Sequence, residues 1–115
     1  MNEYLKDFDG KIATFEVPEF GDKGGERTVQ VRGKIVWPLA VHGVKGEIGY
    51  RITYLITGLY LRRGLSKSVA LGMAEEVVEK KGHELEKYSV DSWFKYQGLI
   101  DWLKGYFLSK ELNES

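Results

Sequence analysis

Cysteine is absent from the 115-residue sequence, and this absence excludes several kinds of site. A chain without thiols forms no disulfide bridge, no zinc centre with thiolate ligands and no cysteine nucleophile. Such a composition suits a reducing compartment. It is the first reason to expect a cytoplasmic protein.

Long apolar runs are also missing. No stretch reaches the roughly 18 uninterrupted apolar residues that a membrane-spanning helix needs. The N-terminal stretch MNEYLKDFDG contains acidic side chains and no apolar run, so it does not resemble a signal peptide. We therefore expect no contact with a membrane.

Groups that carry catalysis or hold metals are few and scattered. The histidines His42 and His83 are far apart, and His42 is most simply interpreted as a strand-end residue with a local hydrogen bond. No HExxH, paired-cysteine, calcium-loop, GxSxG or phosphate-loop motif occurs, although residues 20–27 are rich in glycine. Asp7 and Asp9 could chelate a cation weakly, but such a pair is usually solvated. We predict no enzymatic activity, no cofactor and no metal site.

Net charge is zero, which argues against a bulk attraction to nucleic acid, but the charges are unevenly distributed. Residues 1–27 and residues 68–115 each carry a net charge of −3. Residues 28–67 carry +6, with Glu47 as the only acidic residue in that stretch. A basic middle between acidic flanks creates a local field that the total conceals.

The chain does contain enough apolar material for one core. Hydrophobic residues make up 43% of the sequence and aromatic residues 13%, so a domain of this size needs no disulfide or metal to fold. The length fits one domain. We predict a single α+β domain over residues 1–115.

The first half of the chain shows the alternation of β-strands, most clearly in residues 28–37. Apolar side chains occupy one parity, namely Val29, Val31, Ile35 and Trp37. Polar side chains occupy the other, namely Thr28, Gln30, Arg32 and Lys34. Because successive side chains of a strand point to opposite faces, this pattern predicts one buried face and one wet, basic face. Gly33 is a candidate bulge, and Pro38 interrupts the strand.

Other strands are predicted on both sides of this one. Residues 11–17 alternate roughly and end at Pro18, which favours the edge of a sheet. Residues 50–55 and 59–62 predict a hairpin around Gly58. The strands together span about residues 11–62.

The second half of the chain has helical spacing. Ser66 is a good N-cap for a helix over about 66–81, which Gly82 would end. A second helix is predicted over about 90–112, with Trp93, Tyr96, Leu99, Ile100, Leu103, Tyr106 and Phe107 as its apolar set. The fold prediction is therefore α+β, with an antiparallel sheet of four to five strands followed by two helices packed on one face.

The wet face of the sheet is the strongest candidate for a binding surface. If the strands share one sheet with helices on one side, the open side carries Gln30, Arg32, Lys34, Arg51, Thr53, Tyr60 and Arg62. Such a surface could dock on an acidic protein surface, or pair with phosphates and stack a base. Arg62, Arg63 and Lys67 form a second basic cluster beside the first helix. The alternative for both sets is an ordinary solvated surface.

The aromatic residues of the last helix cannot all lie on one narrow stripe. Trp102 and Tyr106 are therefore candidates for a partner or homodimer patch, and core burial is the alternative.

Residues 38–80 contain PLAVHG and then GYRITYLITGLYLRRGLSKSVALGMAEEV. This pattern resembles small proteins of phages and mobile elements, which have a strand, a threonine–glycine turn, a second strand and an alanine-rich helix. The turn of those proteins often reads threonine–histidine–apolar–proline–threonine–glycine. Here tyrosine and isoleucine replace the histidine and the proline, at Tyr54 and Ile56. The resemblance covers about a third of the chain, and it implies a fold fragment and a viral or mobile-element origin but no reaction.

These observations lead to one functional hypothesis and one alternative. The first is a small phage- or mobile-element-type protein that binds and inhibits or modulates a host protein or ribonucleoprotein by occlusion, in the host cytoplasm. A defence complex such as CRISPR, or the transcription machinery, would fit as the target. The alternative is a nucleic-acid-binding module that uses the same basic face.

Overall fold

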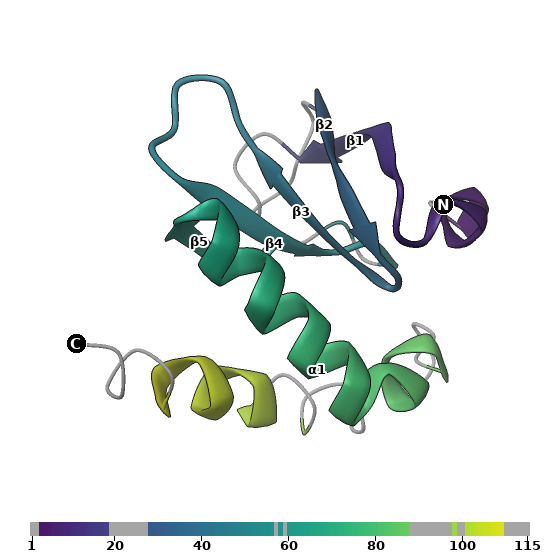
Figure 1. The fold of residues 1–115 in the computed structure, drawn as a ribbon, viewed down its shortest axis with the longest axis vertical. Helices are drawn as coiled ribbons and strands as arrows, with labels where there is room; N and C mark the ends of the chain where they lie inside the picture. Colours follow the sequence, from purple (N-terminus) through teal and green to yellow (C-terminus); the bar gives the residue numbers. More distant parts are fainter. Residues whose placement is uncertain are drawn as a thin grey trace.

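The computed structural model describes residues 3–18, 28–56, 58, 60–87, 98 and 101–109. A short 3-10 helix, η1 (Glu3–Phe8), precedes a five-stranded antiparallel sheet and the long helix α1 (Lys67–Lys87). The strands are β1 (Ile12–Pro18), β2 (Thr28–Val36), β3 (Leu39–Gly43), β4 (Tyr50–Tyr54) and β5 (Tyr60–Leu65). Residues 101–109 are helical and pack with α1 (Figure 1). The predicted α+β fold, a sheet followed by two helices, is confirmed.

The strands follow one another across the sheet in the order in which they occur along the chain. β1 is an edge strand, as Pro18 at its end predicts. Pro38 interrupts the run of strand residues as predicted, because Trp37 and Pro38 form the two-residue turn between β2 and β3. The carboxylate of Asp9 accepts a hydrogen bond from the backbone N–H of Trp37 at 3.1 Å, which fixes this turn to the N-terminal segment.

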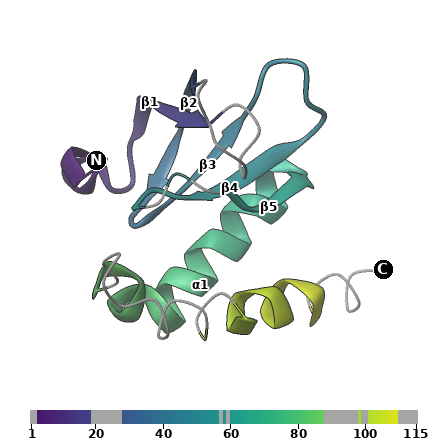
Figure 2. The same cartoon turned by 180° about the vertical axis from the view of Figure 1, so that it is seen from behind.

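Both faces of the sheet carry a hydrophobic core. On the face covered by α1, the core includes Val36, Leu39, Val41, Ile52 and Tyr54 of the sheet with Ala70, Met73, Ala74 and Val77 of the helix. On the opposite face, the core includes Leu5 of η1, Phe15, Val17, Val31, Ile35, Trp37, Ala40 and Leu55. The sheet is strongly twisted, and α1 crosses only one side of it (Figures 1 and 2).

This arrangement corrects one expectation about β2. Val31, Ile35 and Trp37 are buried as predicted, but they face away from α1. The polar parity of β2, which includes Arg32 and Lys34, lies on the helix side instead. The prediction assumed that a buried strand face must be the face that the helices cover, whereas η1 and the neighbouring strands bury this one.

Gly33 marks a close approach between strands, and the predicted bulge is wrong. Its pairing is regular on both sides, with Ala13 of β1 and His42 of β3. A Cβ atom at Gly33 would lie 2.6 Å from Cβ of His42. On the same face of the sheet, the ring centres of Phe15 and His42 lie 5.4 Å apart, edge to face.

Helix α1 begins as predicted and ends later than predicted. The Ser66 hydroxyl accepts a hydrogen bond from the N–H of Val69 at 3.4 Å, so Ser66 is the N-cap. The helix continues through Gly82 to Lys87. A helical glycine costs about 1 kcal/mol relative to alanine, whereas full burial of a leucine side chain yields about 2 kcal/mol or more. Leu85 is fully buried, and its carbonyl accepts a hydrogen bond of 2.6 Å from the Tyr54 hydroxyl, which favours continuation.

The second helix is described over residues 101–109 and at residue 98. Leu103 and Phe107 are buried in the core under α1, as predicted. The remaining members of its predicted apolar set, apart from Tyr106, lie outside the described residues. Neither α1 nor the described part of this second helix is long and apolar enough to span a membrane.

Candidate functional site

The predicted basic face is divided between the two sides of the sheet. Gln30, Arg32 and Lys34 lie on the α1 side of β2, where Gln30 and Arg32 are exposed and Lys34 is half-buried. Arg51 and Thr53 lie on the opposite side, because Arg51 pairs with His42 and His42 pairs with Gly33. Both are buried, at 3% and 0% exposure. The expectation of one open face that holds all of these residues is therefore wrong.

The structure does bring three of the predicted residues together. Arg32 and Lys34 of β2 and Lys67, the first residue of α1, line one groove of about 410 Å³. The groove lies between the start of α1 and the β1–β4 part of the sheet. Its apolar lining comes from Ile12, Val41, Tyr50 and Leu71, with Gly33 completing it. This set of residues, the three cations and their apolar floor, is called the basic groove below.

The described lining of the basic groove is positively charged. Its lining contains no carboxylate. Within the described ranges, Arg32, Lys34 and Lys67 take part in no ion pair. The strip of positive charge is short, because the next pair of residues along β1 and β2 on this face is Glu16 with Gln30. Three cations over an apolar floor favour a ligand that is both acidic and aliphatic.

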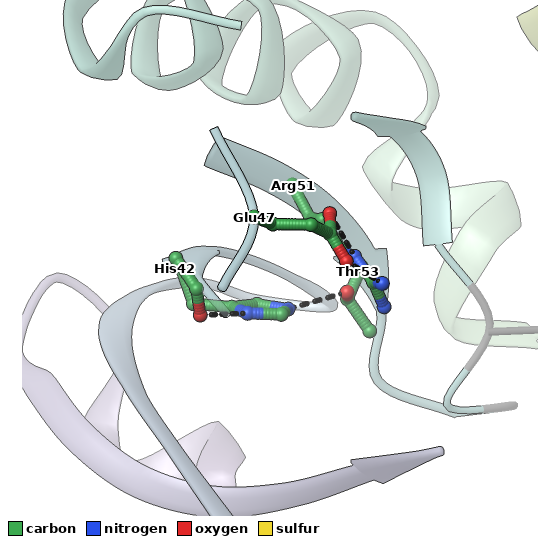
Figure 3. A network of polar contacts seen from close by, with 5 residues as sticks. His42, Glu47, Arg51 and Thr53 are labelled. Atoms are coloured by element: carbon green, nitrogen blue, oxygen red, sulfur yellow. Dashed lines mark hydrogen bonds and ion pairs between the residues drawn. The ribbon is translucent and has the colours of Figure 1, made fainter. Parts of the chain in front are cut away.

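The opposite side of the sheet holds a buried polar network (Figure 3). The Nδ1 atom of His42 lies 3.0 Å from the carbonyl oxygen of Gly43, and Nε2 lies 2.6 Å from the hydroxyl oxygen of Thr53. A carbonyl only accepts, so Nδ1–H is the donor and Nε2 accepts the Thr53 proton in the neutral ring. The simple interpretation of His42, a strand-end residue with a local hydrogen bond, is confirmed.

Arg51 joins this network to the loop between β3 and β4. Its guanidinium donates two hydrogen bonds to the carboxylate of Glu47, one of them from Nε at 3.0 Å and the other from Nη2. The same guanidinium lies 5.0 Å from the centre of the Tyr60 ring, and that of Arg63 lies 5.7 Å from it. The half-buried Tyr60 is therefore in contact with two arginines, and Arg51 is buried within the protein.

Burial lowers the pKa of His42 below its ordinary value. The hydrogen bond to the Gly43 carbonyl acts in the opposite direction, the positive charge of Arg51 lowers the pKa, and Glu47 raises it. The hydrogen bond from Arg51 lowers the pKa of the Glu47 carboxyl. The network thus holds a neutral imidazole beside an ion pair.

Comparison with known proteins gives no match among family models, curated proteins or solved structures.

The network predicts a loss of stability in mild acid. The unfolded chain binds a proton at His42 below about pH 6.5, whereas the folded chain resists protonation there. We expect the free energy of unfolding to fall as the pH drops from about 6.5 towards the folded pKa of His42. The free energy of unfolding should fall a second time below the ordinary pKa of Glu47, because the folded chain holds this carboxyl in its charged form. Chemical denaturation across this pH range measures both.

A matched pair of variants assigns the first loss. His42→Gln removes the titrating ring, so the free energy of unfolding should change less with pH around pH 6. His83→Gln should leave it unchanged, because His83 is exposed on α1. A wild-type chain that is equally stable at pH 5 and pH 7 would contradict the assignment.

The remaining predicted residues lie apart from the basic groove. Arg62 is half-buried in β5, and Arg63 is exposed. Trp102 and Tyr106 are half-buried against α1, stacked on each other with ring centres 5.5 Å apart. Lys81 lies 5.1 Å from the Trp102 ring centre, so contacts within the chain already use this predicted patch.

No metal-binding cluster of three or more histidine, aspartate or glutamate residues occurs in the described part of the chain. Asp9 of the predicted acidic pair instead accepts a hydrogen bond from the β2–β3 turn.

Sequence analysis missed the floor of the groove and the Glu47–Arg51 pair. Val41, Tyr50 and Leu71 look like ordinary core residues, and only tertiary contacts place them beside Arg32. Glu47 did carry a signal, since it is the lone acidic residue of the basic stretch. An isolated acid four positions before an arginine is a candidate internal partner, which would have removed Arg51 from the predicted surface.

Proposed function

We propose that this protein is a non-enzymatic binding protein that docks its basic groove on an acidic surface of a partner protein. The observation that carries the proposal is the convergence of Arg32, Lys34 and Lys67 around an apolar floor. Cations that have no partner within the described chain are available to an outside carboxylate. The groove supplies charge and apolar contact area, and binding needs both.

The mode of action we propose is occlusion. A domain of this size covers a sizeable patch on a partner, and so it blocks whatever that patch otherwise binds. The resemblance of residues 38–80 to phage and mobile-element proteins supplies the proposed setting. In that setting the partner is a host protein or ribonucleoprotein, of a defence complex or of the transcription machinery.

The nucleic-acid alternative is less well supported by the geometry. Single-strand binding uses a basic track with aromatic platforms, over about 4 nucleotides or more. Here the positive strip holds three cations and ends beside Glu16. Tyr60, the expected platform for a base, lies on the other face between Arg51 and Arg63.

The proposal predicts a groove-dependent partner. We expect the tagged protein to retain a defined host protein or complex in an affinity pull-down, and Arg32→Glu/Lys34→Glu/Lys67→Glu to lose it. The control is Lys6→Glu/Lys45→Glu/Lys104→Glu, which reverses three exposed lysines outside the groove. Both variants carry the same net charge, so any long-range repulsion between the protein and an acidic partner is the same in both. Mass spectrometry of the retained proteins is the measurement.

Three results are informative. Loss of the partner in the groove variant alone supports the proposal. Equal retention by both variants would show that the groove does not dock the partner. Binding that falls steeply with salt and is abolished by nuclease would favour the nucleic-acid alternative.

A further inference from the structure

We infer that the occupant of the basic groove is an extended polypeptide segment in which acidic and aliphatic side chains alternate. This inference rests on the proposed function and names the chemistry of the partner's contact. It follows from the lining of the groove, in which the cations stand among apolar side chains. Across the sheet, Lys34 lies between Ile12 and Val41, and α1 contributes Lys67 and Leu71.

The lining of the groove contains both exposed cations and buried apolar atoms. Arg32 and Lys67 are exposed to solvent, on opposite walls formed by β2 and α1. Val41, at the floor, is only 3% exposed. A segment that runs along β2 therefore meets the positive charge of Arg32 and Lys34 and the apolar atoms beside them. Alternation lets an extended chain present carboxylates at every second position and aliphatic side chains between them.

The spacing of the cations on β2 fits an extended segment. Arg32 and Lys34 are two residues apart and point to the same face, which separates them by about 6.8 Å along the strand. Carboxylates at positions i and i+2 of an extended segment have the same separation. On the facing wall, Lys67 can pair with a further carboxylate.

The dimensions of the groove admit a few side chains of a partner. A volume of about 410 Å³ falls in the range of ligand-sized sites, which is about 300 to 1,000 Å³, so the groove holds a few side chains. Ile12, which is 58% exposed, is an apolar part of the lining that is open to solvent. Aliphatic side chains packed there would remove this surface from water.

The inference can be tested with defined peptides and isotope-labelled protein. The probe is a short, end-blocked peptide that alternates glutamate and valine, titrated while backbone amide resonances are followed. We expect shifts at residues 32–34, 41, 67 and 71. A peptide with serine in place of valine should bind about tenfold more weakly, because it has the same charge but no aliphatic side chains.

Variants of the protein separate the contribution of the cations to peptide binding from that of the apolar lining. Arg32→Glu/Lys34→Glu/Lys67→Glu should abolish binding of the glutamate–valine peptide, and the Lys6, Lys45 and Lys104 control should retain it. At the floor, Ile12→Ser should weaken binding about threefold to tenfold. Its control is Ile48→Ser, which changes an isoleucine that is 95% exposed and outside the groove. Both isoleucines are exposed, so neither change should affect folding.

The outcomes distinguish the inference from the proposed function. Equal binding of the two peptides, shifts outside the groove, or tighter binding of a thymidine oligonucleotide would each overturn the inference. If no peptide binds but a host partner still depends on Arg32, Lys34 and Lys67, the inference fails and the proposed function stands. If the peptide binds in the groove but no partner depends on it, the proposed function fails instead.

Discussion

The Gly33→Ala variant is expected to lose about 3 kcal/mol of unfolding free energy, because the new methyl group has no space. It would lie 2.6 Å from Cβ of His42 and against the backbone of Val41, neither of which is a flexible side-chain end. Relief requires β3 to move away from β2, which would disturb the contact between Phe15 and His42. Urea denaturation followed by circular dichroism measures the loss.

The matched control is Gly72→Ala. Gly72 is exposed on α1, and a Cβ atom there meets nothing within 4 Å. The same substitution should therefore stabilise the protein by about 0.5 to 1 kcal/mol through helix propensity. Opposite signs at the two glycines would confirm the close approach of β2 and β3. A Gly33→Ala variant as stable as the wild type would show that the strands are further apart than this structure places them.

The Leu85→Ala variant is expected to cost about 3 kcal/mol, within the usual range of about 2 to 5 kcal/mol for a buried leucine. Leu85 is fully buried, and its carbonyl binds the Tyr54 hydroxyl. The variant distinguishes two possible ends of α1. If the helix ended at Gly82, Leu85 would lie in solvent, and its truncation would lower the free energy of unfolding only slightly. The measurement is the midpoint of urea denaturation, compared at an unchanged dependence of the unfolding free energy on urea concentration.

Leu108→Ala is the control variant for Leu85→Ala. Leu108 is 58% exposed on the described C-terminal helical segment, so its truncation should change stability by less than about 0.5 kcal/mol. Similar small losses for both leucines would place the end of α1 near Gly82 and would remove the Tyr54–Leu85 link from the fold.

The division of the sheet also separates binding from folding. The basic groove and the His42–Thr53–Arg51–Glu47 network lie on opposite faces. Charge reversal in the groove should therefore leave the pH dependence of stability in place. This independence is what allows the groove variants to be interpreted as changes in binding.

Much of the fold follows from local patterns. Alternation in residues 28–37 predicts a strand and its buried parity, and the spacing of Val69, Ala70, Met73, Ala74 and Val77 predicts a helix with Ser66 as its cap. The fold class follows from the order of these elements. These predictions succeed because each depends on side chains within one or two turns or within a single strand.

The end of α1 and the role of Gly33 could not be predicted in this way. Glycine after a run of lysines is a common helix stop, but the burial of Leu85 outweighs the local cost of Gly82. Gly33 within a strand suggests a bulge, but a close neighbour is an equally good reason for glycine. In both cases a contact distant in sequence decides between two local possibilities.

The sequence alone determines that the chain has a basic middle, alternating strands and amphipathic helical segments, because these properties belong to neighbouring residues. The tertiary structure decides which basic residues share a surface. Pairing of His42 with both Gly33 and Arg51 sends Arg51 inward on one face and leaves Arg32 and Lys34 beside Lys67 on the other. The physical reason is that a shift of one residue in strand register moves every side chain to the opposite face, and the pattern within one strand does not specify its register with the next.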